Sequence, residues 1–216
     1  MYLQKHPAAM ITLTPITTPA KLQEYYRFRY RIYSESRQVG FLRDSEDGMD
    51  IDRYDARARH YGWYLNGELV GCVRFVEPDA SEDALPMLCY MTESAPRIAV
   101  KRFIDERCSQ GEPMVEASRF CLAPEHRGLR TAKEFVLAMV RTMQPLGYEQ
   151  GLFDCDERHS AFYSLLGFEN LEGAGSFQLN GFKSVSCAKR YDFAKVLARN
   201  PGIMKEVGAN KMRLAA

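Results

Sequence analysis

The chain has 216 residues, of which 46% are hydrophobic and 26% are charged, and its formal net charge is +1. This length suits one domain with an ordinary buried core, and the near-neutral charge gives no global argument for binding nucleic acid or an anionic membrane. The N-terminal segment lacks the apolar run of a signal peptide, and no segment approaches the roughly 20 apolar residues of a membrane span. We therefore expect a cytoplasmic protein, whose six cysteines should be reduced because no export signal is seen. No pair of cysteines has the C-x-x-C spacing of a zinc ribbon or a redox dithiol.

The first half of the chain predicts a strand, a helix, a long loop and a hairpin. Residues 11–16 alternate apolar side chains with threonines. Thr18 before Pro19 is typical of the start of a helix, which we expect to reach about Ser36. No period is visible from 38 to about 56, and so long a loop inside a compact domain is often functional. Strands over 59–65 and 69–78 then meet at Asn66-Gly67, a favoured hairpin turn.

The second half predicts further strands and helices. Residues 78–112 are ambiguous, although 96–108 has the spacing of a helix. A helix from Thr131 to about Gln144, a strand over 148–157, a short helix over 159–168 and a closing hairpin around Asn180-Gly181 are expected. We therefore predict an α/β fold, with one mixed central sheet flanked by helices in a single domain over 1–200, and a polar tail over 201–216.

The strand within 113–124 carries charged residues on both faces. Its alternation predicts two sets of side chains, with Val115, Ala117, Arg119 and Cys121 on one face and Glu116, Ser118, Phe120 and Leu122 on the other. The turn PEHRGLR follows, directly before a helix. Free backbone N–H groups at a helix start bind phosphate well, and Arg127 and Arg130 would add positive charge. The alternative is a solvated basic turn.

The segment AFYSLLGF, residues 161–168, packs a short helix onto the sheet and ends it at Gly167. In order and spacing, PEHRGLR and AFYSLLGF together resemble the GNAT superfamily of acyltransferases. The resemblance implies a binding site for the pyrophosphate or phosphopantetheine of the acyl donor, formed by Leu122, Arg127, Gly128, Arg130, Thr131 and Ala132. Arg130 stands where the family usually has glycine, so its side chain would either crowd the pyrophosphate or pair with a phosphate.

Four further segments, RYRIY, GMDIDRYD, LVGCVRF and VEASRF, resemble the autoinducer (acyl-homoserine lactone) synthase branch of that superfamily and the related long-chain N-acyl amino acid synthases. The resemblance implies one charge network beside the acyl-transfer site, comprising Arg29, Asp50, Asp52, Asp55, Arg74, Glu116, Ser118 and Arg119. Asp50 stands where autoinducer synthases typically have glutamate, and Tyr33 where they have phenylalanine. These departures put a homoserine-lactone product in doubt, but not acyl transfer.

Acyl transfer from a thioester to an amine needs a proton acceptor, because only the free amine attacks. Glu116 is our candidate base, and a paired strand glutamate is the alternative. Backbone N–H groups around residues 120–122 would stabilise the developing oxyanion, and Tyr163 would protonate the leaving thiolate.

Other combinations of reactive residues have structural explanations that compete with a functional role. The aspartates of GMDIDRYD form either a solvated loop or part of the network; an EF-hand is excluded because Arg43 would take the first ligand position. Cys121 with His126 is a weaker candidate for a thiol nucleophile and its base. Asp154, Asp156 and Glu157 are expected to cap the following helix rather than to hold a metal.

The sequence thus predicts an N-acyltransferase that moves a fatty acyl group to the amine of a small amino-acid-like acceptor. We expect no tightly bound cofactor and no metal, with acyl carrier protein or coenzyme A carrying the acyl group as co-substrate. Acyl carrier protein is acidic, and Arg127, Arg130 and Lys133 would suit its docking. The alternatives are an ordinary acetyltransferase that uses acetyl-coenzyme A and a non-catalytic module that binds an acyl ligand.

Overall fold

The computed structural model describes residues 11–36, 42 and 45–201 of the chain. Eight strands form one sheet in this part, in the order β1-β2-β3-β4-β5-β8-β6, and β7 also pairs with β8. The strands are β1 (Thr14–Pro15), β2 (Arg59–Leu65), β3 (Glu68–Val76), β4 (Met114–Leu122), β5 (Gln150–Asp156), β6 (Glu169–Asn170), β7 (Ser176–Gln178) and β8 (Val185–Asp192). Only β4 and β5 pair in parallel within the described chain, so the sheet is mixed.

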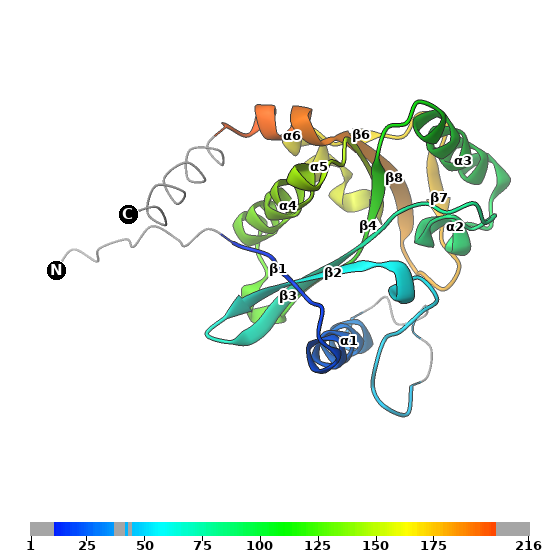
Figure 1. The fold of residues 1–216 in the computed structure, drawn as a ribbon. Helices are drawn as coiled ribbons and strands as arrows, with labels where there is room; N and C mark the ends of the chain where they lie inside the picture. The colour runs from blue at the N-terminus through cyan, green and yellow to red at the C-terminus, as the bar shows by residue number, and fades with distance from the viewer. Residues whose placement is uncertain (1–10, 37–41, 43–44, 202–216) are drawn as a thin grey trace.

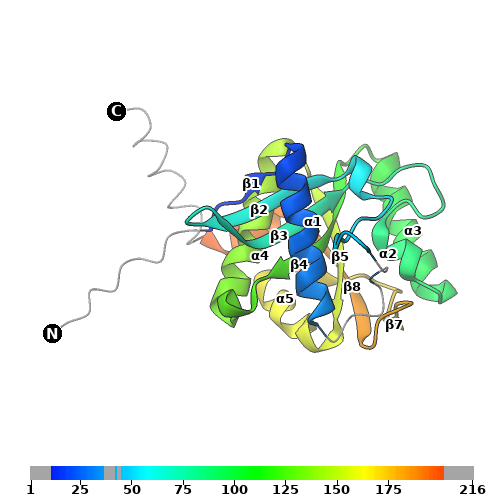
Figure 2. The ribbon, with the colours of Figure 1, turned by 90° about the horizontal axis from the view of Figure 1, so that it is seen from below.

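Helices cover both faces of the sheet (Figure 1). The helices are α1 (Pro19–Ser34), α2 (Pro86–Tyr90), α3 (Ser94–Ser109), α4 (Leu129–Met143), α5 (Ser160–Leu166) and α6 (Phe193–Arg199). Seen from below, α1 crosses β2, β3 and β4, with α2 and α3 beside it, whereas α4, α5 and α6 cover the opposite face (Figures 1 and 2). The predicted α/β architecture is therefore confirmed.

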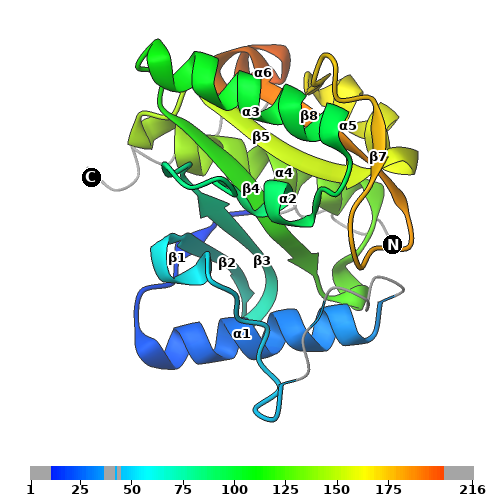
Figure 3. The same ribbon diagram turned by 90° about the vertical axis from the view of Figure 1, so that its right-hand side faces the viewer.

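The strands β4 and β5 separate partway along their length. They pair at Met114↔Gln150, Val115↔Gly151 and Glu116↔Leu152, and no pair follows although both strands continue. Figure 3 shows the two strands leaving each other, with α2 over β4 at the opening. The sheet is thus split from Glu116 onward.

A β-bulge in β4 changes the faces predicted for its second half. Cys72↔Cys121 and Arg74↔Ser118 are register pairs, so one extra residue lies in β4 between them. Arg119 has a positive φ of 54° at this point. Ser118 and Arg119 both contact groups on the α1 face, whereas the Phe120 ring packs 5.0 Å from that of Phe135 on α4. The expectation that Arg119 lies opposite Glu116 and Ser118 is therefore wrong.

Several local predictions are confirmed and others need adjustment. The Thr18 hydroxyl accepts the Lys21 N–H and caps α1, and the hairpin turns at Asn66-Gly67. The helix predicted from Thr131 begins two residues earlier, at Leu129. Helices α2 and α6 were not predicted, and residues 202–216 of the predicted tail lie outside the described residues.

The apolar stripe of α4 is buried against the sheet, as its spacing predicts; Phe135, Val136, Val140 and Met143 are each at most 3% exposed. All six cysteines are free thiols. Within the described residues, no helix has both the length and the apolar composition needed to cross a membrane.

Candidate functional site

Three arginines and three aspartates form a buried charge network on the α1 face of the sheet. Arg29, fully buried on α1, donates to Asp50 Oδ2 from Nε and Nη2 at 2.8 and 2.7 Å, and to Asp55 Oδ1 from Nη1 at 2.7 Å. Arg74 of β3 is also fully buried, and its Nη1 lies 3.0 Å from Asp55 Oδ1. Asp50 and Asp55 are 7% and 5% exposed, so they do not belong to a solvated acidic loop.

The remaining members of the network connect it to β4. Arg74 donates from Nη1 to Asp52 Oδ1 at 2.6 Å and from Nε to the Ser118 hydroxyl at 3.2 Å. Arg119 lies 3.0 Å from Asp50 and 3.2 Å from Asp52, measured from Nε and Nη2 respectively. The aspartates are thus neutralised by arginines from three elements, which leaves them no role as a metal cage.

The network is held in its ionised form. Burial alone would raise the pKa of Asp55 and of Asp52, but the adjacent arginines outweigh it and lower both values. Because positive and negative groups are equal in number, no net charge is buried. The network therefore fixes residues 50–55 against α1, β3 and the bulge of β4.

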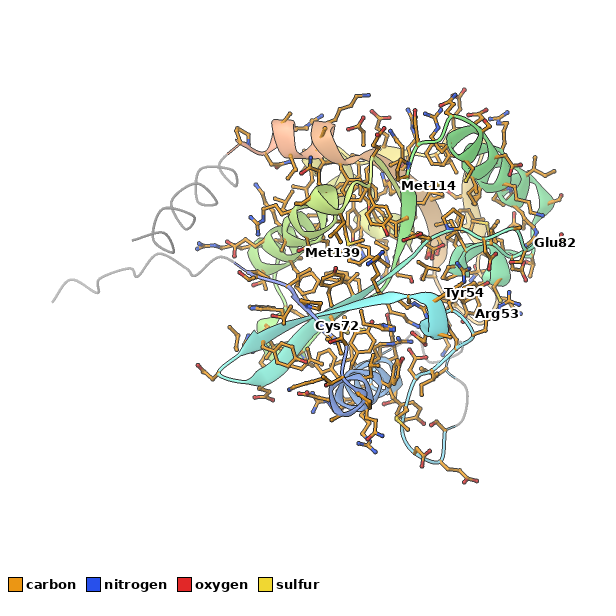
Figure 4. All side chains as sticks on the ribbon, in the orientation of Figure 1. Arg53, Tyr54, Cys72, Glu82, Met114 and Met139 are labelled. Atoms are coloured by element: carbon orange, nitrogen blue, oxygen red, sulfur yellow. The ribbon has the colours of Figure 1, made fainter. Side chains whose placement is uncertain are left out.

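A cavity of about 300 Å³ lies at the split between β4 and β5. Its polar wall includes Glu116, Ser118, Arg119 and Asp154. Its apolar wall comes from the opposite side of the sheet and from α2, and includes Met87, Val136, Met139, Val140, Phe153, Phe168 and Tyr191. Met139 lies on the sheet side of α4 (Figure 4). An apolar pocket with a few polar groups is the usual form of a small-molecule site.

Glu116 lies at the point where the strands part and is 1% exposed. Its Oε2 accepts the backbone N–H of Met87 at 3.1 Å, so the unpredicted helix α2 holds this side chain in place. The expectation that Glu116 is a member of the charge network is therefore wrong: its carboxyl lies beside the network and hydrogen bonds to α2. Burial first, and the negative charge of Asp154 second, raise the pKa of Glu116 to about 8. A carboxylate with so high a pKa is a much stronger base than an ordinary glutamate.

Tyr163 of α5 also lines the cavity, where its ring packs 4.7 Å from that of Phe153. Burial, followed by the nearby Cys155 and Asp154, raises the pKa of Tyr163, so its hydroxyl keeps its proton at neutral pH. Glu116, Ser118, Arg119 and Tyr163, all predicted from sequence, therefore share one cavity.

Asp154 was missed as a site residue. The side chain that caps the turn before α5 is Asp156, which accepts the Arg158 N–H at 3.0 Å, whereas Asp154 lies in the cavity wall. Burial raises the pKa of Asp154 to about 6. A carboxylate between Phe153 and Cys155 in a buried strand is the signal in the sequence that pointed to this position.

The turn before α4 lies where it was expected, but its arginines contact protein groups in this structure. Arg127 Nε donates to Leu122 O at 3.0 Å, so this side chain closes the end of β4. Arg130 is 77% exposed and pairs with Glu134 at 3.0 Å. The first intrahelical hydrogen bond runs from Ala132 N to Gly128 O at 2.8 Å, so the N–H groups before it, including that of Thr131, belong to the open end of α4.

Cys121 and His126 do not form a nucleophile and base. The Cys121 thiol is buried beside Cys72 and Tyr33 on the α1 face. The His126 ring instead packs at 5.7 Å from the ring of Trp63.

Comparison with known proteins gives a family match. A family model described as N-acyl amino acid synthase FeeM matches residues 24–187. No curated protein sequence matches the chain.

Solved structures share the fold. FeeM, an N-acyl amino acid synthase from uncultured soil microbes, is 16% identical with a TM-score of 0.59, over 87% of this chain and 93% of FeeM. BjaI, a coenzyme A-dependent acyl-homoserine lactone synthase solved with SAM and isopentyl-CoA, is 18% identical with a TM-score of 0.63, over 90% of this chain and 89% of BjaI. An N-acetyltransferase from Staphylococcus aureus Mu50 is 14% identical with a TM-score of 0.52, over 86% of this chain and 99% of the acetyltransferase. The predicted GNAT-like fold is thereby confirmed.

Proposed function

Because the chain belongs to the FeeM family of N-acyl amino acid synthases, we propose that it transfers a fatty acyl group from a thioester to the amine of an amino-acid-like acceptor. The observation that carries this proposal is the cavity at the split between β4 and β5, which joins the buried carboxyl of Glu116 to an apolar wall. An acetyl group would leave that wall without contacts, whereas a fatty chain would fill it.

In the proposed reaction, Glu116 takes the proton of the acceptor ammonium, and the amine attacks the thioester carbonyl. Tyr163 donates a hydrogen bond to the leaving sulfur. Backbone N–H groups of residues 120–122, beyond the bulge, are the proposed oxyanion donors. Ser118 and Arg119 line the cavity. In our proposal the Ser118 hydroxyl binds the acceptor's carboxylate, and Arg119 adds positive charge to that wall while it stays paired with Asp50 and Asp52. The buried network then serves to position Arg119.

The donor enters, in our proposal, at the open N-terminus of α4, where the turn of residues 122–132 receives phosphopantetheine. Leu129 is 79% exposed there, beside the basic side chains of Arg127, Arg130 and Lys133. An exposed apolar residue with basic side chains near it in the same turn suits an acidic carrier protein, so we favour acyl carrier protein over coenzyme A as the carrier. The reaction takes place in the cytoplasm in this proposal.

The first test is mass spectrometry of lipophilic extracts from bacteria that express the wild type or Glu116→Gln. We expect a new N-acyl amino acid with the wild type and at least a 10²-fold smaller yield with the variant, as for a lost general base. Purified protein would then be assayed for thiol release with matched acyl carrier protein, coenzyme A and acetyl-coenzyme A donors. Turnover with acetyl-coenzyme A alone would overturn fatty-acyl transfer in favour of an acetyltransferase, and thioester binding without turnover would indicate a binding module.

A further inference from the structure

Two carboxyl groups line the split between β4 and β5, one on each strand. Glu116 is register-paired with Leu152, and Asp154 lies two residues further along β5, so the alternation of a strand places both side chains on the same face of the sheet. Both line the cavity. The negative charge of Asp154 raises the pKa of Glu116 and also that of Tyr163.

The two carboxyls have different surroundings. Glu116 is almost fully buried and is held by the N–H of Met87. Among the described residues, no side chain forms a hydrogen bond or ion pair with Asp154, whose carboxylate meets only the N–H of its own backbone. The positive charge of Arg119 acts on Asp154 from a distance, while the Arg119 guanidinium forms its ion pairs with Asp50 and Asp52. Asp154 is partly buried in the cavity wall, and a carboxylate in such a place without a partner is costly, so a cation that entered the cavity would compensate it.

We propose that Asp154 binds the ammonium group of the acceptor and that Glu116 takes a proton from it. This assignment rests on the proposed N-acyl transfer and divides its acid–base work between two carboxylates. It defines the acceptor as a primary amine that arrives as its ammonium ion. A neutral amide or an alcohol would leave Asp154 without a counter-ion.

The proton count of the reaction is balanced by these groups. The ammonium ion forms an ion pair with the Asp154 carboxylate and loses one proton to the Glu116 carboxylate, which gives the free amine. The amine attacks the thioester carbonyl, the new C–N bond forms and the C–S bond breaks. The nitrogen then loses its second proton to the departing thiolate, which leaves as the thiol and accepts a hydrogen bond from the Tyr163 hydroxyl. Glu116 afterwards returns the first proton to water.

The electrostatics of the pair fit this division. At neutral pH, Asp154, with a pKa raised by burial to about 6, is mostly ionised, whereas Glu116, with a pKa raised to about 8, is mostly protonated. An ammonium ion beside Asp154 offsets the negative charge of Asp154, which after burial is the second cause of the raised pKa of Glu116, and adds a positive charge near the Glu116 carboxyl. Binding of the acceptor therefore lowers the pKa of Glu116 and converts it into the carboxylate that the reaction needs.

The kinetic test compares Asp154→Asn with the wild type, with Asp154→Glu as the conservative variant and Asp105→Asn, an exposed site on α3, as the matched control. For Asp154→Asn we expect the KM of the amine to rise on the order of 10²-fold, as for a lost buried charge pair, while kcat falls less than about tenfold. Asp154→Glu should recover part of the amine affinity, and the KM of the thioester should stay unchanged in all variants. Glu116→Gln should show the reverse split, with kcat reduced and the KM of the amine retained.

A second measurement does not depend on turnover. The Glu116 carboxyl would be titrated by ¹³C NMR with and without methylammonium chloride as a bare ammonium probe, and with tetramethylammonium as a cation that lacks N–H groups. We expect methylammonium to lower the pKa of Glu116 in the wild type but not in Asp154→Asn, and tetramethylammonium to have a smaller effect.

The outcomes separate this inference from the function on which it rests. An N-acyl product from the wild type, together with an unchanged amine KM in Asp154→Asn, would overturn the role of Asp154 and leave acyl transfer intact. An absence of any N-acyl product, with the methylammonium effect present and dependent on Asp154, would overturn the function and leave the ammonium site. An equal methylammonium effect in wild type and variant would refute the ammonium site itself.

Discussion

Substitutions in the buried charge network should destabilise the protein by an amount that depends on the net charge they leave in the network. Arg29→Met keeps the bulk of the side chain but removes five hydrogen-bond donors from a fully buried position, and it leaves two arginines facing three aspartates. Removing one partner of a buried ion pair costs about 3–5 kcal/mol, because the other charge stays buried without compensation. Arg29 contacts two carboxylates, so we expect a loss of about 4–5 kcal/mol in the free energy of unfolding.

Asp50→Asn makes the opposite imbalance, with three arginines facing two aspartates, and we expect it to cost about 3 kcal/mol. The double variant restores neutrality with two of each. Its loss should therefore fall at least about 1 kcal/mol short of the sum of the single losses. Urea unfolding followed by circular dichroism at neutral pH measures all three.

The control for this cycle is the exposed pair Arg190–Glu169, 2.6 Å apart. Arg190→Met and Glu169→Gln should each cost less than about 1 kcal/mol, because water screens an exposed pair. Additivity of Arg29→Met and Asp50→Asn within about 0.5 kcal/mol would refute the shared network, as would a cost for Arg29→Met no greater than that of Arg190→Met.

Two further predictions follow from the cavity. The pKa of Glu116 is raised to about 8 in the folded protein, so its contribution to stability is complete below its unfolded pKa near 4.3 and is lost as the pH rises toward 8. Glu116→Gln should remove this loss of about 1.4 kcal/mol per pH unit, so the stability of the variant relative to the wild type should increase from pH 5 to pH 8. If the free energies of unfolding of the two proteins differ by the same amount at pH 5 and at pH 8, the pKa of Glu116 is not raised. Met139→Trp should fill the α4 side of the cavity and shift selectivity from longer toward shorter acyl donors, whereas Leu146→Trp, at an exposed site, should not. An unchanged chain-length preference in Met139→Trp would place the acyl chain elsewhere.

The elements that the sequence predicts well are those set by local interactions. The Asn66-Gly67 turn places both residues at positive φ, 51° and 85°, as the hairpin requires. The N-cap at Thr18 and the buried stripe of α4 likewise depend on neighbours within one or two turns. The grouping of the arginines and aspartates into one site is predicted by the resemblance of their segments to a known family.

The errors arise where long-range contacts decide the structure. Strand alternation assumes a period of two, and the bulge at Arg119 breaks it because that guanidinium is bound by Asp50 and Asp52 from a distant loop. Helix α2 has only five residues, and its place depends on packing and on the hydrogen bond from Met87 to Glu116. The position of Asp154 follows from the separation of β4 and β5, which no local pattern in either strand reveals.

The charge network also sets the order in which the chain is able to fold. During synthesis, Arg29, the three aspartates of the network and Arg74 leave the ribosome well before Arg119, so the partial chain holds only two of the network's arginines with all three of its aspartates. Burying that unbalanced set is unfavourable, and α1 with the first three strands is therefore not a stable intermediate by itself. The N-terminal half must wait for β4, and the exposed edge of β3 stays open to chaperones, or to wrong pairing, until β4 arrives.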